Sequence, residues 1–552
     1  MSDSADLQPR PGRWSVRLRR AFEDYFGIDL RILALVRIAF GLIVLTQLAM
    51  FAGNIGEFLG DDGLFSPQQM AAGPVASSEI SLHVLSGSSE WQLLLFGVHT
   101  VLALMLVVGY RTRVASVGTW VMTVSLFNGL SFMTHRADTL LCLMLLWGAL
   151  IPWGARYSVD ALKFDLRELP ERVASLGTAG LIAQMPLVYF ATFLDKLPNE
   201  AWNSEWSGVY YALFPEFVNG FGQFVATYQP EVVTRLLSGL TLLIQAVGPV
   251  LAFFPLLVFT SSRVRRRWLN RLRIGVFCGF AGFQMVLLAT VAIGLFPVIS
   301  MAAMLPLLPW FDGSRYSEVV EKWSRQVRES AGCLTRFAGT PSMPGAGNIV
   351  AAALVWLVSV ASIVDHAGVD TGALHQVVSS QSRIVQEWGM FSSPVRGHRT
   401  YIVEAIQNDG ESIDLFGDRG PVGLDSAQDV DERFPMPPRT TSLYDNYRWR
   451  LFFSRVHGFG GMRVSRLEGA RHLYASYVCR SWNRHHDGER EVRTVRLFRL
   501  FDDVGPFETP YTNYGSTDSE IEKNLLWVHW CFEDDRREHG VVPEAPVWGI
   551  GQ

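Results

Sequence analysis

The sequence predicts an all-α, polytopic membrane bundle of about nine transmembrane helices, followed by a C-terminal soluble α+β domain. Hydrophobic residues make up 49% of the 552 residues, and charged residues only 18%. Long apolar runs lie between about residues 30 and 364, and a bilayer core of ~30 Å needs roughly 20 such residues per helix. Short arginine clusters separate the runs, which is typical of loops that set membrane topology.

Nine apolar runs are candidates for membrane-spanning helices. One of them, Val298–Pro309, is short and rich in proline, so it either completes a span or forms a re-entrant half-helix. The other candidates are Ile32–Phe51, Leu93–Val108, Val114–Phe132, Thr139–Trp153, Leu176–Leu194, Val233–Phe259, Ile274–Phe296 and Ile349–Val364.

The basic clusters favour a cytoplasmic N-terminus, because basic loops remain in the cytoplasm. The loop 312–348 is also basic, and it faces the cytoplasm only if Val298–Pro309 crosses the membrane. That gives nine spans and an exported C-terminal domain, whereas eight spans place this domain on the other side. The expected segments are a basic N-terminus (1–29), a transmembrane domain (30–310), a cytoplasmic loop (311–347), a last helix (348–366) and an extracytoplasmic domain (367–552).

The region after residue 370 reads as an ordinary soluble sequence with several strands. Asn408-Asp409-Gly410 lies between two β-rich segments, Tyr401–Ile406 and Ser412–Phe416, and predicts a hairpin. Arg471–Arg480 and Glu491–Phe501 are also predicted to be strands. A disulfide between Cys479 and Cys531 is one possibility if this domain is exported.

Several functional classes lack support in the sequence. The net charge of −4 gives no indication of nucleic-acid binding. The sequence also contains no phosphate-binding glycine loop, no nucleophile elbow and no metal-binding motif such as HExxH. Function is therefore sought among the polar residues close to the membrane, where an ionisable group is costly to place.

Lys196 and His135 are the candidate catalytic residues. Lys196 closes the fifth predicted span and His135 follows the third, so both are expected at the exported membrane surface. A lysine in a partly desolvated pocket can act as a base, and a histidine can relay a proton. The alternatives are that Lys196 snorkels to the lipid head groups and that His135 is an inert interfacial residue.

Other polar residues near these spans have less definite roles. Tyr189 and Thr192 share a helical face with Lys196, so together they line either a polar cavity or a helix contact. Asp195 beside Lys196 is expected to be a solvated charge or to keep the amine protonated. Arg37 in the first span is expected to snorkel to the cytoplasmic surface. Three further polar residues are expected to join helices: His99, Gln245 and Gln284.

Several short motifs, in this order, resemble the HTTM (horizontally transferred transmembrane) domain family, which includes vitamin K-dependent gamma-carboxylase. The resemblance covers roughly residues 29–309, and more weakly a stretch after the last span. The motifs are Leu33–Gly41 with its Arg37, Asp61–Phe65, Gly109–Arg113, His135 with Leu140-Leu141, Tyr157–Asp160, Val188–Phe190, Lys196, Trp206, Gly208, Tyr210 and Trp388–Phe391 with Pro394.

The resemblance implies a carboxylase-related enzyme in which Lys196 deprotonates a reduced quinone such as vitamin K and His135 supports the reaction. Tyr189, Thr192 and Trp206 would then contact the substrate. The sequence departs from the carboxylase at Asp195, where the carboxylase has a second lysine. A second hypothesis is therefore a non-catalytic membrane protein that anchors the tail, binds a lipid or assists export. The family type suggests a bacterial cell membrane.

Overall fold

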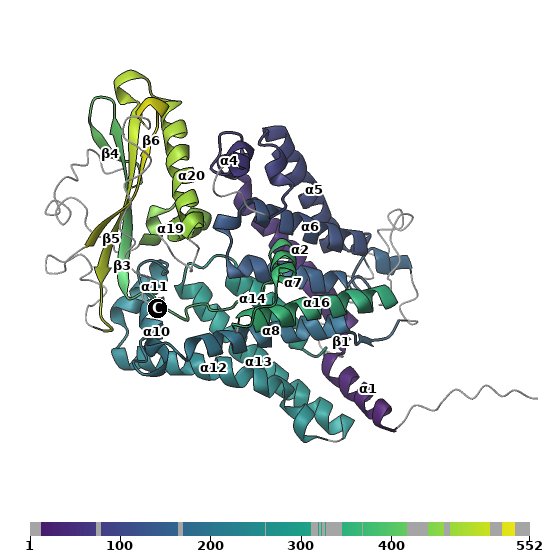
Figure 1. Cartoon of the computed structure of the whole chain (residues 1–552). Coiled ribbons are helices and arrows are strands. Elements are labelled where there is room, and N and C mark those ends of the chain that lie inside the picture. Colours follow the sequence, from purple (N-terminus) through teal and green to yellow (C-terminus); the bar gives the residue numbers. More distant parts are fainter. Residues whose placement is uncertain are drawn as a thin grey trace, which may run out of the picture.

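The computed structural model describes residues 13–72, 79–163, 169–259, 261–310, 345–366, 368–416, 440–456, 464–507 and 522–535, and three isolated positions between 311 and 344. Within these ranges the chain is mostly helical and carries one small four-stranded sheet (Figure 1). The predicted loop 311–347 lies almost entirely outside the described residues, as does Cys333.

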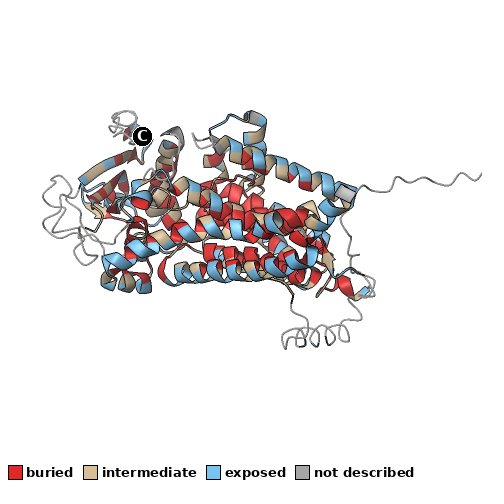
Figure 2. Ribbon diagram, turned by 90° about the horizontal axis from the view of Figure 1, so that it is seen from below, coloured by how far each residue is buried: buried red, intermediate tan, exposed pale blue. Residues whose placement is uncertain are grey.

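Six helices in the described part of the chain are long and apolar enough to cross a membrane. Their outward faces carry exposed leucine, valine and phenylalanine side chains, while buried residues gather inside the bundle (Figure 2). These observations support the predicted class of integral membrane protein. The six helices are α2 (Leu30–Ala52), α5 (Ser89–Val108), α8 (Leu176–Lys196), α12 (Glu231–Val258), α13 (Ser262–Thr290) and α16 (Ala346–His366).

The other three predicted spans form shorter or less apolar helices. These are α6 (Thr112–Gly129), α7 (Arg136–Ala149) and α14 (Phe296–Met304). With 14 residues, α7 is about 21 Å long, which is less than the hydrocarbon core of a bilayer. All its residues from Ala137 to Gly148 are buried, because neighbouring helices surround it. The count of nine spans therefore stays a prediction.

Arg37 does not snorkel to the membrane surface, contrary to the prediction. Its side chain is fully buried, and its guanidinium donates to the carbonyls of Leu106, Val107 (2.7 Å), Trp153 (3.3 Å) and Tyr157 (2.6 Å). Two of these carbonyls belong to the last turn of α5, where the unpaired carbonyl groups favour a cation. Arg37 therefore holds the end of α5 against the loop after α7.

The arginines of the N-terminus and of the cluster 263–273, which are predicted to face the cytoplasm, lie on helices rather than in loops where the structure describes them. The arginine cluster 263–273 occupies the first turns of α13, and the amphipathic helix α1 (Arg13–Phe26) packs beside it. Asp24 of α1 pairs with Arg266 at 2.7 Å and with Arg265 at 3.4 Å. The short strands β1 (Ile28–Asp29) and β2 (Arg172–Val173) pair next to α1.

The C-terminal part contains an antiparallel sheet of order β4-β3-β5-β6. Its strands are β3 (Gly397–Gln407), β4 (Ser412–Asp414), β5 (Val492–Asp503) and β6 (Glu522–Trp530). The predicted hairpin is confirmed, and Gly410 in its turn has the positive φ of +86° that glycine adopts readily. The predicted strand at Glu491–Phe501 is likewise confirmed as part of β5.

The predicted strand at Arg471–Arg480 is wrong, since these residues belong to helix α20 (Val464–Asn483). Leu473, Tyr474, Tyr477 and Val478 recur at helical spacing, and they turn one face of α20 toward the protein interior. The β-branched and aromatic residues that suggested a strand are accommodated by this tertiary packing. Cys479 on α20 forms a disulfide with Cys531, just after β6.

Helix α19 (Tyr447–Val456) joins the sheet to the bundle, as Figure 1 shows. Phe453 packs on Tyr401 of the sheet, with ring centroids 6.1 Å apart. One turn earlier on the same face of the helix, Trp449 lies 5.4 Å from Phe58 of the bundle. Shorter helices fill the connections, namely α3 (Ile55–Leu59), α4 (Pro67–Ala72), α9 (Glu200–Asn203), α10 (Gly208–Ala212), α11 (Gly220–Tyr228) and α17 (Ala373–Ser382).

Candidate functional site

The inward face of α8 carries the polar residues that the sequence singled out. Ser175 caps the helix at its N-terminus through a reciprocal capping box with Thr178. Tyr189, Thr192 and Lys196 follow at spacings of three and four residues, so they share one face. All three are buried, with exposed fractions of 4% or less. The prediction of a shared face is therefore confirmed.

This face binds the backbone of a segment that follows the last predicted span. Thr192 Oγ1 donates to the carbonyl of Trp388 at 2.8 Å, and Lys196 Nζ donates to that of Met390 at 2.6 Å. The indole of Trp202 donates to the carbonyl of Phe391 at 2.7 Å. The Lys196 Nζ also lies 5.0 Å from the centre of the Trp202 ring, a cation–π distance. The three hydrogen bonds fix the segment 388–391, hereafter the docked segment.

His135 is the N-cap residue of α7 and has a defined tautomer. Its Nδ1 accepts a hydrogen bond from the Ala137 N–H at 3.2 Å, while the Asp138 carboxylate accepts from the His135 N–H at 2.7 Å. Because Nδ1 is an acceptor, a neutral ring carries its proton on Nε2. Burial lowers the pKa of His135 to about 3; Asp138 opposes this shift, and Arg448 and Arg450 add to it. The imidazole is therefore neutral near pH 7 and offers one N–H donor.

Arginines from the C-terminal part of the chain hold the stretch around His135. Arg448 forms a double ion pair with Asp138, with N–O distances of 2.6 and 2.8 Å, and also donates to the Met133 carbonyl at 2.7 Å. Arg455 donates to the carbonyls of Ser131 (2.6 Å) and Thr134 (2.5 Å). No sequence motif pointed to these arginines, because their partners lie about 300 positions away.

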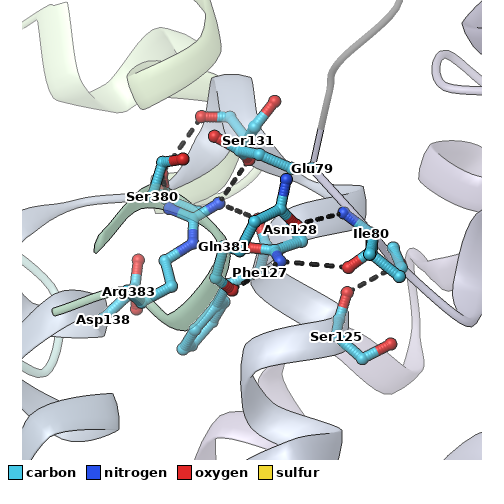
Figure 3. A network of polar contacts seen from close by, with 12 residues as sticks. Glu79, Ile80, Ser125, Phe127, Asn128, Ser131, Asp138, Ser380, Gln381 and Arg383 are labelled. Carbon is cyan, nitrogen blue, oxygen red and sulfur yellow. Dashed lines mark hydrogen bonds and ion pairs between the residues drawn. The ribbon is translucent and has the colours of Figure 1, made fainter. Parts of the chain in front are cut away.

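Arg383 makes a further polar network on the neighbouring side of the same stretch (Figure 3). Its guanidinium donates to Asn128 Oδ1 at 2.8 Å and to the Phe127 carbonyl at 2.6 Å, and it pairs with Glu79 at 3.1 Å. Asn128 in turn donates to the carbonyl of Gln381 at 3.1 Å. The network fastens the chain after α17 to the C-terminal end of α6, close to where the docked segment begins.

Lys196 and His135 line the same cavity, which has a volume of about 640 Å³. This size is within the range of small-molecule sites in proteins. Tyr189 and Thr192 line it too. Trp206, the remaining predicted binding residue, is not part of the lining; it is 39% exposed. Trp202 lines the cavity instead, which the sequence motif alone did not indicate.

The wall of the cavity is mainly apolar and aromatic, with a few polar groups at different depths. Deep in the bundle, Gln284 of α13 donates through Nε2 to the hydroxyl of Tyr189 at 2.7 Å, so this residue joins two helices as predicted. His99 likewise lies 3.1 Å from Thr123 of the adjacent helix. Gln245 of α12 also lines the cavity, and its Oε1 has no hydrogen-bond partner among the residues that the structure describes. A ligand here would meet apolar walls and a few fixed polar atoms.

A metal centre gains no support from the described ranges, which contain no group of three or more His, Cys, Asp or Glu residues placed to bind an ion. Comparisons with models of protein families, with curated proteins and with solved structures found no match. The chemistry available at the cavity is therefore that of an amine, an imidazole N–H and several guanidinium groups beside an apolar chamber.

Proposed function

We propose that this chain is a multi-pass membrane protein of the HTTM type that binds a lipophilic, weakly acidic ligand such as a quinol and acts on it with Lys196 as the base. The observation that carries the proposal is that Lys196 and His135, which are 61 positions apart in the sequence and were expected at the same membrane surface, line one cavity with Tyr189 and Thr192. An amine and an imidazole beside an apolar chamber suit proton removal from a lipophilic hydroxyl group.

The geometry is compatible with a base that is also hydrogen bonded to the docked segment. A neutral amine has two N–H groups and one lone pair, so Lys196 can donate to the Met390 carbonyl while the lone pair accepts the ligand's proton. His135 donates through Nε2–H to the resulting oxyanion. A base positioned in this way contributes roughly 2 to 4 powers of ten in rate.

The proposal includes nine spans, a cytoplasmic N-terminus and an exported C-terminal domain, within the segment boundaries predicted above. Two observations support this orientation. The arginine-rich start of α13 lies at the end of the helix opposite Thr290, which lines the cavity. The disulfide Cys479–Cys531 belongs to the part that would be exported, and disulfides persist in oxidising compartments.

The alternative is a non-catalytic membrane anchor, and one observation favours it. Lys196, Thr192 and Trp202 all donate to carbonyls of the docked segment, so a purely structural role accounts for all three side chains. In this case the amine fixes the chain where it leaves the last predicted span, and the cavity holds a structural lipid.

Two matched substitutions separate these functions. Lys196→Gln keeps an N–H donor for the Met390 carbonyl but removes the base, whereas Thr192→Val removes a docked-segment bond and leaves the amine. Wild type and both variants are purified in mild detergent, and bound lipophiles and their chemical change over time are followed by mass spectrometry. The proposal expects ligand in all three proteins and no turnover in Lys196→Gln. Thr192→Val should still turn over, at a rate lowered only by weaker binding, because Thr192 also lines the cavity.

Two outcomes would contradict the catalytic function. If none of the three proteins contains a quinol-like or weakly acidic lipophile, the proposed substrate is ruled out. If Lys196→Gln converts the ligand at the wild-type rate, Lys196 is not the base and the anchor function is favoured. The thermal midpoint of each variant serves as the control for folding.

A further inference from the structure

One guanidinium at the cavity wall is buried without a counter-charge. Arg450 of α19 is 8% exposed and lines the cavity. Its Nη1 donates to the backbone carbonyl of Glu216 at 2.7 Å, and the group lies 4.9 Å from the Tyr447 ring centre and 5.7 Å from that of Phe217. Within the described residues, no carboxylate forms an ion pair with it. A buried charge of this kind is stabilised further by a nearby opposite charge.

The charges around Arg450 leave room for an anion. The Glu216 carboxylate, the only acidic group in the described lining of the cavity, is engaged through both oxygens by Arg399. Lys196 likewise has no carboxylate partner within hydrogen-bonding distance in the described part of the chain. The described lining also contains four arginines, Arg136, Arg399, Arg450 and Arg455. Arg399 pairs with Glu216, and Arg136 pairs with Glu387 outside the lining. The described lining of the cavity therefore carries an excess of positive charge.

Part of the cavity wall is also exposed on the apolar outer surface of the bundle. Leu240 of α12 and Val286 of α13 line the cavity, yet they are 47% and 59% exposed. Helix α11 packs beside α13, and its Phe224 and Tyr228 are 60% and 72% exposed, as in the aromatic belts at membrane surfaces. The cavity thus reaches the level of the hydrocarbon through the faces of α12 and α13.

We propose that the cavity binds an amphiphile whose hydrocarbon chain enters along α12 and α13 and whose anionic group, a carboxylate or phosphate, lies between Arg450 and Lys196. This inference deepens the proposed function and rests on it only in placing a lipophilic ligand in this cavity. It requires no turnover, because the arginine charges and the exposed part of the wall exist whether or not Lys196 acts as a base. A neutral Lys196 amine still has an N–H group that can donate to the anionic group. A fork of guanidinium donors suits both kinds of anionic group.

Binding of three ligands with the same chain tests the charge preference. Oleate, oleyl phosphate and oleyl alcohol are titrated into the protein in nanodiscs of phosphatidylcholine, with sodium acetate and inorganic phosphate as anions without a chain. Wild type is expected to bind at least one anionic amphiphile about tenfold or more tighter than the alcohol, and neither small anion comparably. Arg450→Gln should reduce this ratio to about threefold or less, and Arg450→Lys should largely retain it.

The control is Arg484→Gln, since Arg484 is half-exposed and paired with Asp62, and neither residue belongs to the described lining of the cavity. The ratio measured for this variant should equal that of wild type. Equal affinity of wild type for the alcohol and both anionic amphiphiles would overturn the inference while leaving a lipophile site. The inference would also be overturned if Arg450→Gln kept the wild-type ratio of affinities for the anionic amphiphile and the alcohol, or if inorganic phosphate bound as tightly as oleyl phosphate. If none of the three oleyl compounds binds, the inference is overturned, whereas the proposed function is decided separately by the mass spectrometry of bound lipophiles and their turnover.

Discussion

The buried ion pair between Asp138 and Arg448 is the contact whose removal should most clearly loosen the C-terminal part from the bundle. Asp138 is 1% exposed and Arg448 is 8% exposed. In Asp138→Asn the guanidinium stays buried but loses its counter-charge, retaining mainly the Met133 carbonyl. Breaking a buried pair by removing one partner costs about 3–5 kcal/mol, and the same change weakens the cap that orients His135.

The free energy of unfolding is measured by titrating the purified protein in mixed micelles with sodium dodecyl sulfate. The double variant Asp138→Asn/Arg448→Met should be more stable than the sum of the single effects predicts, by about 1–3 kcal/mol, because neither charge is then left alone. Glu231→Gln is the matched control. Its partner Arg235 and Glu231 itself are about half exposed, and such surface pairs contribute less than about 1 kcal/mol.

The reasoning would be refuted by either of two results. A loss below about 1 kcal/mol in Asp138→Asn would mean that the pair contributes no more than a surface pair. Additive single effects in the double variant would show that the two side chains do not depend on each other in the folded protein.

Three further predictions concern other parts of the fold. Gly180→Ala should destabilise the bundle by about 1–3 kcal/mol, because its new methyl group would lie 2.6 Å from the Trp147 ring. The control Gly97→Ala has open space around the new methyl group and should be neutral or slightly stabilising. The thermal midpoints of the two variants are compared with that of wild type. Cys479→Ser should lower the stability of the C-terminal part by up to about 4 kcal/mol, since the disulfide closes a loop of 52 residues, and reduction of the wild-type protein should reproduce the effect. Burial, followed by the charge of Arg399, lowers the pKa of His398 from 6.5 to about 3, so the unfolded chain binds this proton first as the pH falls. The stability supplied by the neutral ring is present above pH 6.5 and should be lower by about 2 kcal/mol at pH 5, and a His398→Phe variant should show a correspondingly smaller loss between pH 8 and pH 5.

Much of the fold follows from local sequence patterns. The apolar runs predicted the long helices because hydrocarbon thickness fixes the length of a spanning helix. Asn408-Asp409-Gly410 predicted the hairpin because a turn needs a residue that accepts positive φ. The prediction of a strand at Arg471–Arg480 was wrong because its valine and tyrosines favour a strand by propensity, while their spacing favours a helix packed against the sheet. The prediction that Arg37 snorkels was wrong because the carbonyl groups that bind it lie on segments that are distant in sequence.

The candidate site was predictable in part. Lys196 and His135 were expected at the same membrane depth because their spans exit on the same side, and they do line one cavity; their chemical roles stay a prediction. The contribution of Arg448 and Arg450 could not be predicted, because no local pattern links them to α7 or to Glu216. The docked segment could not be predicted either, since it is recognised through backbone carbonyls, which every residue possesses.

The long sequence separation of the docked segment has a consequence for biosynthesis. Thr192 and Lys196 emerge from the ribosome 196 and 194 residues before Trp388 and Met390, their hydrogen-bond partners. At 5–20 residues per second, this interval is roughly 10–40 s. During that time the end of α8 has a polar face without its final acceptors. This face of α8 can therefore be completed only after the docked segment has been made, and chains truncated before residue 388 would present the face to lipid, chaperones or proteases.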